Sequence, residues 1–300
     1  MTPEVQSAFA PWSISVPVTL ALSLAVCVYL RGWLRLRSST VPNAISRWQL
    51  ASFMSGMFAV WIVLGSPLRA LHHQLLSIHM VDHVLLMAVA APLILLGAPL
   101  RSFVPGLPQR FVREALARFV CWSPEHRLGR VLGHPIFCWL VAAIALIGWH
   151  VPAAFELGMR SNLWHEVEYA CFFGTGLLFW WPVIQPWRNV TRSPRWSIVL
   201  YLFFATLLCD MLSAFLTFCD RVVYPCYLSG NRHLGISPLQ DQEYAGALMW
   251  VCVTFVYLVP AVVITMQLLS TPSAHDPHPG RGDLPQVSAR PLTGPGVEVV

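Results

Sequence analysis

Long apolar stretches recur along the chain, with short polar connections between them. A helix needs about 20 mainly apolar residues to cross a hydrocarbon core. Seven stretches approach or exceed this length, at residues 16–34, 48–64, 74–96, 135–150, 165–183, 196–218 and 244–269. The lipid interior cannot hydrogen-bond the backbone, so each stretch must form a helix. The sequence therefore predicts an all-α fold, a polytopic membrane bundle of about seven transmembrane helices over residues 16–269. The fourth helix could continue past Pro152.

Charged residues are scarce, and their types exclude several classes of protein. The chain is 56% hydrophobic and 11% charged, whereas a soluble domain carries about 25% charged residues. All 19 basic residues are arginine, so no lysine amine is present for Schiff-base chemistry such as retinal binding. The eight cysteines contain no Cys-x-x-Cys pair, which excludes zinc-ribbon and thioredoxin-like proteins.

The arginines alternate between the two sides of the predicted bundle. Fifteen of the 19 arginines follow the first, third, fifth and seventh stretches. The connections on the opposite side hold the remaining four, which are Arg69, Arg160, Arg221 and Arg232. Positive charge stays on the cytoplasmic side, so we predict an outer N-terminus and a cytoplasmic C-terminus.

This orientation can be tested with a reporter. A reporter fused at Thr271 should read as cytoplasmic, because an odd number of spans places the end of the last helix on the arginine-rich side. A periplasmic signal would contradict both the orientation and the helix count.

Three segments lie outside the predicted spans. Residues 1–15 are expected to form a short outer N-terminus. From about 108 to 122, apolar residues fall on one helical face and charged residues on the other, which predicts an amphipathic helix on the inner membrane surface. Residues 270–300 are rich in proline and glycine and are expected to be a disordered cytoplasmic tail.

Four histidines map to the outer ends of three predicted helices. His79 and His83 are one turn apart on the third helix, so their side chains share a face. His150 ends the fourth helix, and His165 begins the fifth at a similar depth. Imidazole is a ligand for copper, zinc and iron. We predict that the four rings converge on a metal or haem site near the outer surface; the alternative is that they make structural hydrogen bonds between helices.

Acidic side chains inside the predicted spans add to this site. Asp82, Glu168 and Asp210 lie in the outer halves of their helices, where an unpaired charge is costly. Glu168 is about one turn from His165 and could orient its imidazole from a second shell. Asp82 and Asp210 are further second-shell candidates, although a structural hydrogen bond would equally explain Asp210. Cys219 and Cys226 flank the outer end of the sixth stretch and could form a disulfide.

Four motifs in this order resemble those of the CtaG-type family of cytochrome c oxidase assembly proteins. They are HMVDHVLLMAVAAPLILLGAPL at 79–100, GWHVP at 148–152, FWWPVIQP at 179–186 and SPLQDQEYAGALMW at 237–250. The resemblance covers roughly residues 50–268. It implies a seven-helix membrane protein that is needed to make an active haem–copper oxidase and that helps copper reach it.

The resemblance also implies particular residues. The family's histidines carry over to His79, His83, His150 and His165, and its aspartate and tryptophan near the last span carry over to Asp241 and Trp250. The family often has His-x-x-Glu-His at the start of the fifth helix. Tyr169 stands here in place of the second of those histidines and could donate a hydrogen bond within the second shell.

The expected function follows from this resemblance. We expect an assembly factor without catalytic turnover, in a bacterial inner membrane, with copper as the metal handled. The expected partners are membrane lipid, cytochrome c oxidase subunits and periplasmic copper chaperones, and no nucleic acid. A copper transporter is one alternative; it would need a polar path across the membrane, but the polar residues occupy only the outer halves of the spans. A haem-binding membrane redox protein is the other, and its absorbance spectrum would distinguish it.

Overall fold

The computed structural model describes most of the predicted bundle. The described residues are 14–38, 45–66, 74–108, 133–184, 194, 196–228 and 235–270. The predicted amphipathic helix at about 108–122, beyond its first residue, and the predicted tail, beyond Ser270, lie outside the described residues.

Every regular element in the described part of the chain is helical. The elements are α2 (Val16–Ser38), α3 (Arg47–Leu64), α4 (Leu76–Val84), the π-helix η2 (Leu85–Ala90), α5 (Ala91–Leu96), α6 (Pro99–Gly106), α9 (Pro135–His150), α10 (Pro152–Arg160), α11 (Asn162–Ile184), α12 (Trp196–Phe218), the 3-10 helix η3 (Pro225–Tyr227) and α13 (Pro238–Ser270). Six spans are long and apolar enough to cross a membrane, and there are seven if α9 and α10 count as one. The predicted all-α bundle of about seven membrane helices is therefore confirmed, and the chain is a multi-pass membrane protein.

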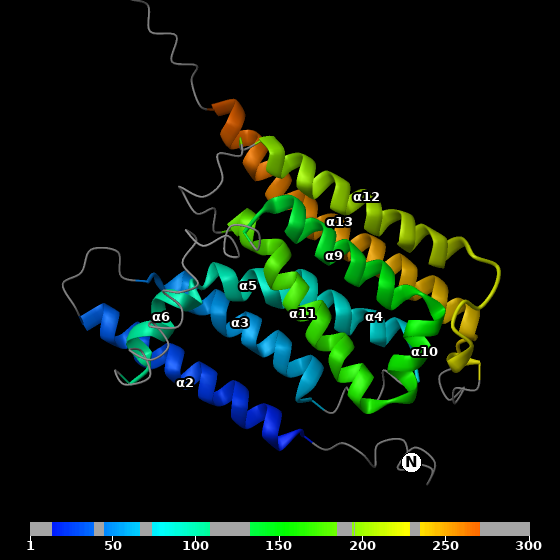
Figure 1. Ribbon diagram of the computed structural model, residues 1–300, viewed down its shortest axis with the longest axis horizontal. Coiled ribbons are helices and arrows are strands. Elements are labelled where there is room, and N and C mark those ends of the chain that lie inside the picture. The colour runs from blue at the N-terminus through cyan, green and yellow to red at the C-terminus, as the bar shows by residue number, and fades with distance from the viewer. Residues whose placement is uncertain are drawn as a thin grey trace, which may run out of the picture.

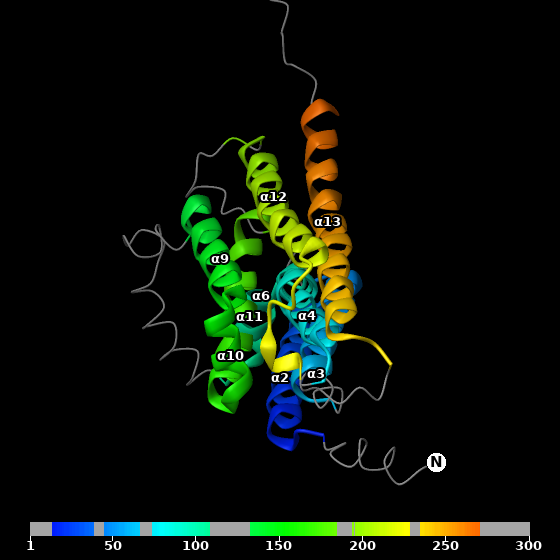
Figure 2. The same ribbon diagram turned by 90° about the vertical axis from the view of Figure 1, so that its right-hand side faces the viewer.

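The long helices lie side by side in one bundle (Figure 1). The helix formed by α4, η2 and α5 runs through its middle, with α2 and α3 on one side and α12 and α13 on the other; Figure 2 shows the same arrangement from the right-hand side of that view. Large apolar side chains such as Leu24, Phe203 and Phe255 are exposed on the outward faces, where lipid is the matching solvent. The first turns of α4, α11 and α13 and the last turn of α9 lie at the same end of the bundle (Figure 1).

The fourth helix does not continue straight past Pro152. Proline has no N–H to donate to the preceding turn and disfavours helical geometry at the residue before it. Val151 accordingly has an extended conformation, and α10 leaves α9 at an angle of 74°. After the bend, Phe155 of α10 is buried against the His79 and Tyr224 rings.

A second proline shapes the central helix. Pro92 follows the π-helix η2, in which Ala91 donates its N–H to the carbonyl of Leu86. Pro92 cannot supply the next bond of this register, which would go to the Met87 carbonyl. The indole N–H of Trp180 on α11 donates to that carbonyl instead, at 3.0 Å. α11 lies close to η2 near this bond, and a Cβ added at Gly176 would lie only 2.9 Å from Met87 Cα.

Candidate metal centre

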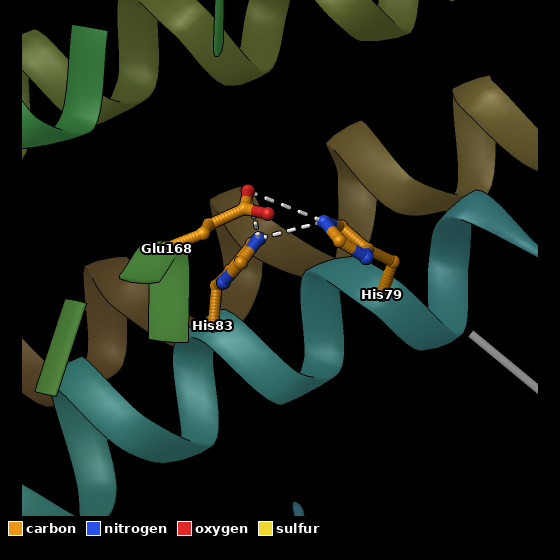
Figure 3. A group of neighbouring side chains, drawn as sticks. All are labelled: His79, His83 and Glu168. Carbon is orange, nitrogen blue, oxygen red and sulfur yellow. Dashed lines mark hydrogen bonds and ion pairs between the residues drawn. The ribbon is translucent and has the colours of Figure 1, made fainter. Parts of the chain in front are cut away.

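Two histidine rings meet on the face of α4 that points into the bundle. His79 and His83 are both buried, and their Nε2 atoms lie 2.8 Å apart (Figure 3). Two imidazole lone pairs would repel each other at this distance. The contact is favourable only when one nitrogen carries a proton, which it donates to the other, or when a cation is shared between them.

Glu168 on α11 completes a group of three possible ligands. Its Oε1 lies 3.2 Å from His83 Nε2 and 3.5 Å from His79 Nε2 (Figure 3). One ligand atom from each residue lies within 4.8 Å of the other two. The carboxylate therefore contacts both α4 imidazoles directly, whereas the sequence placed it in a second shell beside His165. Gly158 of α10 leaves it room, because a Cβ there would stand 2.7 Å from Glu168 Oε2.

The other two histidines lie around this group. The ring of His165 is 5.5 Å from that of His79, and the ring of His150 is 6.5 Å from that of His83, between centroids. His150 Nδ1 lies 2.7 Å from the Leu146 carbonyl and must donate its proton there. In the neutral ring the lone pair then sits on Nε2, which is buried and has no hydrogen-bond partner among the described residues.

Of the other three predicted second-shell residues, Asp82 and Tyr169 lie at the site and Asp210 does not. Tyr169 donates a hydrogen bond to Asp82 Oδ2 at 2.8 Å, and its ring lies 4.3 Å from that of His165. Asp210 instead accepts a hydrogen bond from Thr254 of α13 at 3.2 Å. No contact described for Asp210 reaches any of the four histidines.

Aromatic residues form the walls of the site, and the sequence did not single out two of them, Phe155 and Phe172. The ring of Phe172 lies tilted against that of His83, with centroids 4.1 Å apart, and the ring of Phe155 lies 5.0 Å from that of His79. The hydroxyl of Tyr224 donates a hydrogen bond to the His150 carbonyl at 3.0 Å. Burial raises the pKa of this hydroxyl, so Tyr224 stays protonated as a donor. Phe172 is one turn beyond Glu168 and could have been found by extending the same helical face. Phe155 could not have been found in this way, because its position depends on the bend between α9 and α10.

Two residues named by the resemblance have contrasting positions. Asp241 of α13 accepts hydrogen bonds from the backbone N–H groups of Leu76 and Ser77, at 2.6 and 3.1 Å, and so holds the start of α4. Trp250 lies edge-on to Phe218 of α12, with ring centroids 6.3 Å apart. Asp241 is therefore tied to the histidine helix, whereas the ring contact described for Trp250 lies between α12 and α13.

The disulfide that the sequence left open is not formed in the structure. No disulfide bond joins Cys219 to Cys226. The connection between α12 and α13 is held instead by Gln242, whose side chain accepts a hydrogen bond from the Val223 N–H at 2.7 Å.

Comparison with known proteins identifies the family. The family described as cytochrome c oxidase caa3 assembly factor matches residues 27–271. An uncharacterized protein of Mycobacterium bovis and one of Mycobacterium tuberculosis are each 25% identical over 83% of this chain, and one of Mycobacterium leprae is 21% identical over 89% of it. The matched region spans only 38% to 40% of the length of these relatives. No solved structure matches. The chain belongs to the cytochrome c oxidase caa3 assembly factor family.

Proposed function

We propose that this protein assists the assembly of a haem–copper cytochrome c oxidase in a bacterial inner membrane by holding copper as cargo. The observation that carries the proposal is the buried group of His79, His83 and Glu168, whose ligand atoms lie within 4.8 Å of one another. Buried polar atoms placed this close are costly unless they share protons or a cation. The Nε2 of His150 supplies a further imidazole nitrogen beside the group.

The donor set favours copper. Sites built from nitrogen and oxygen bind copper more tightly than the other divalent metals of the first transition row, and imidazole suits copper well. The aromatic walls formed by Phe155 and Phe172 keep the group away from bulk water. Such walls control solvent access to a bound metal.

The arrangement fits a pocket better than a path through the membrane. The buried acidic and histidine side chains lie at the end of the bundle where α4, α11 and α13 begin. Further along these helices and α12, buried side chains such as Leu95, Phe179 and Leu202 are apolar. A transporter would need polar groups along the whole route.

The arrangement also argues against a haem held between the paired histidines. Two axial haem ligands occupy opposite faces of the macrocycle. His79 and His83 share one face of α4, and Glu168 contacts both Nε2 atoms. We therefore propose copper transfer to oxidase subunits, with periplasmic copper chaperones as the source and no chemical turnover.

The proposal can be tested with His83→Ala. We expect the purified wild-type protein to retain copper through dialysis, and the variant to lose at least about 10-fold in affinity because one of three converging ligands is gone. In cells that depend on this chain, we expect the variant to lower the copper content of the oxidase. Equal copper binding and equal oxidase loading by the two proteins would contradict the proposal. A Soret band in the wild-type spectrum would favour haem.

A further inference from the structure

The helix that carries His79 and His83 has no cap of its own. An α-helix leaves the N–H groups of its first turn without partners inside the helix, and Ser, Thr, Asp or Asn usually precedes it to accept one of them. The residue before α4 is Leu75, whose side chain makes no capping hydrogen bond. Another part of the chain must therefore supply the acceptors.

Asp241, in the first turn of α13, supplies them. Its Oδ2 accepts the Leu76 N–H at 2.6 Å, and its Oδ1 accepts the Ser77 N–H at 3.1 Å and the Ser77 hydroxyl at 2.6 Å. The carboxylate is buried, and its negative charge matches the partial positive charge at a helix N-terminus. Both oxygens are used, so the contact fixes the position and the rotation of α4 together.

Rotation of α4 decides whether the site exists. His79 follows Ser77 by two residues, a rise of about 3 Å along the helix. A shift at the first turn is therefore passed directly to the His79 ring, and one turn later to His83. Their Nε2 atoms meet Glu168 on α11 at 3.5 and 3.2 Å, distances that a small rotation of α4 would lengthen.

The next residue of α13, Gln242, holds the connection between α12 and α13 that carries Tyr224. Gln242 is fully buried, and its Nε2 donates to the carbonyls of Leu216 and Arg221 at 3.2 and 3.1 Å. Its Oε1 accepts the N–H of Val223, the residue before Tyr224. Since Tyr224 bonds the His150 carbonyl, one turn of α13 secures both α4 and the connection that reaches His150.

We propose that Asp241 is a positioning residue, which sets α4 so that His79 and His83 meet Glu168. The copper-affinity measurement that tests this role rests on the copper function proposed above. Asp241→Asn keeps the size of the side chain but puts an NH₂ group where one of the two oxygens now accepts a backbone N–H. Ser77→Ala removes one of the three bonds and serves as a milder variant should Asp241→Asn fold poorly. Tyr29→Phe is the matched control, because it removes a buried hydrogen bond between helices, to the Gly97 carbonyl at 2.8 Å, outside the histidine group.

Two measurements on the full chain in detergent test the proposal. The first is the ¹⁵N spectrum of the metal-free, histidine-labelled protein. We expect the ring-nitrogen signals of His79 and His83 to move in Asp241→Asn, to move less in Ser77→Ala, and to stay in place in Tyr29→Phe. The second is the affinity for added copper ions. We expect a loss of about 10- to 100-fold in Asp241→Asn, the range seen for groups that orient metal ligands, and less than about 2-fold in Tyr29→Phe.

The outcomes separate positioning from the copper function itself. The positioning role is wrong if the His79 and His83 signals move no more in Asp241→Asn and Ser77→Ala than they do in the control Tyr29→Phe. It is equally wrong if copper affinity falls by the same factor in Asp241→Asn and Tyr29→Phe, because a general loss of stability would then explain it. If the wild-type protein binds no copper but the signals still move in Asp241→Asn alone, the copper function fails and the positioning of α4 stands.

Discussion

Replacing Glu168 with glutamine is expected to weaken copper binding by at least about 100-fold. Glutamine fills the same space but has no charge, and its NH₂ group cannot act as a ligand. The change removes a proposed ligand itself, so its effect should reach or exceed the 10- to 100-fold loss known for groups that only orient ligands. Copper titration of the purified protein, followed by competition with a chelator of known affinity, measures the difference.

A matched control lies two residues away. Glu166→Gln makes the same chemical change on α11 at an exposed position and should leave copper affinity unaltered. The melting temperature of metal-free Glu168→Gln should equal or exceed that of the wild type, because a buried carboxylate is costly to desolvate. If Glu168→Gln and Glu166→Gln bind copper equally well, Glu168 is not a ligand. If Glu168→Gln unfolds far more easily than the wild type, the three residues form a structural hydrogen-bonding group.

Adding a single methyl group at Gly176 should disrupt the packing that carries the site. A Cβ there would lie 2.9 Å from Met87 Cα, closer than real Cβ atoms approach, and 3.0 Å from the Met87 carbonyl oxygen, which is also tight. Alanine would therefore push α11 away from η2, at a cost of about 1–3 kcal/mol in the free energy of unfolding. The Trp180–Met87 hydrogen bond would lengthen, and Glu168 would move away from the α4 histidines.

Gly174 offers the comparison on the same helix. A Cβ at Gly174 meets nothing within 4 Å, so Gly174→Ala should be neutral or slightly stabilising, since alanine favours the helix by about 1 kcal/mol over glycine. Thermal unfolding in detergent, together with copper titration, checks both variants. The close α11–η2 contact would be refuted if Gly176→Ala were as stable as Gly174→Ala and bound copper equally well.

The membrane helices and the face that carries the paired histidines were determined by the sequence itself. Lipid leaves the backbone no partner except its own helix, so an apolar run of sufficient length is enough to predict a span. The predicted sixth span coincides with α12, Trp196–Phe218. The spacing of His79 and His83 likewise determines that their side chains share a face, because helical periodicity needs no tertiary information.

The ligand geometry was decided only by tertiary structure. The rise of about 1.5 Å per residue places His83 one turn further along α4 than His79, yet its Nε2 contacts both His79 and Glu168. This contact depends on how closely α11 approaches the central helix, and Gly176 and the π-helix η2 set that distance. The cap on α4 comes from Asp241, 165 residues beyond Leu76 in the chain. Composition and periodicity specify which residues face the bundle interior, but the positions of their atoms to within an ångström follow from packing between helices far apart in sequence.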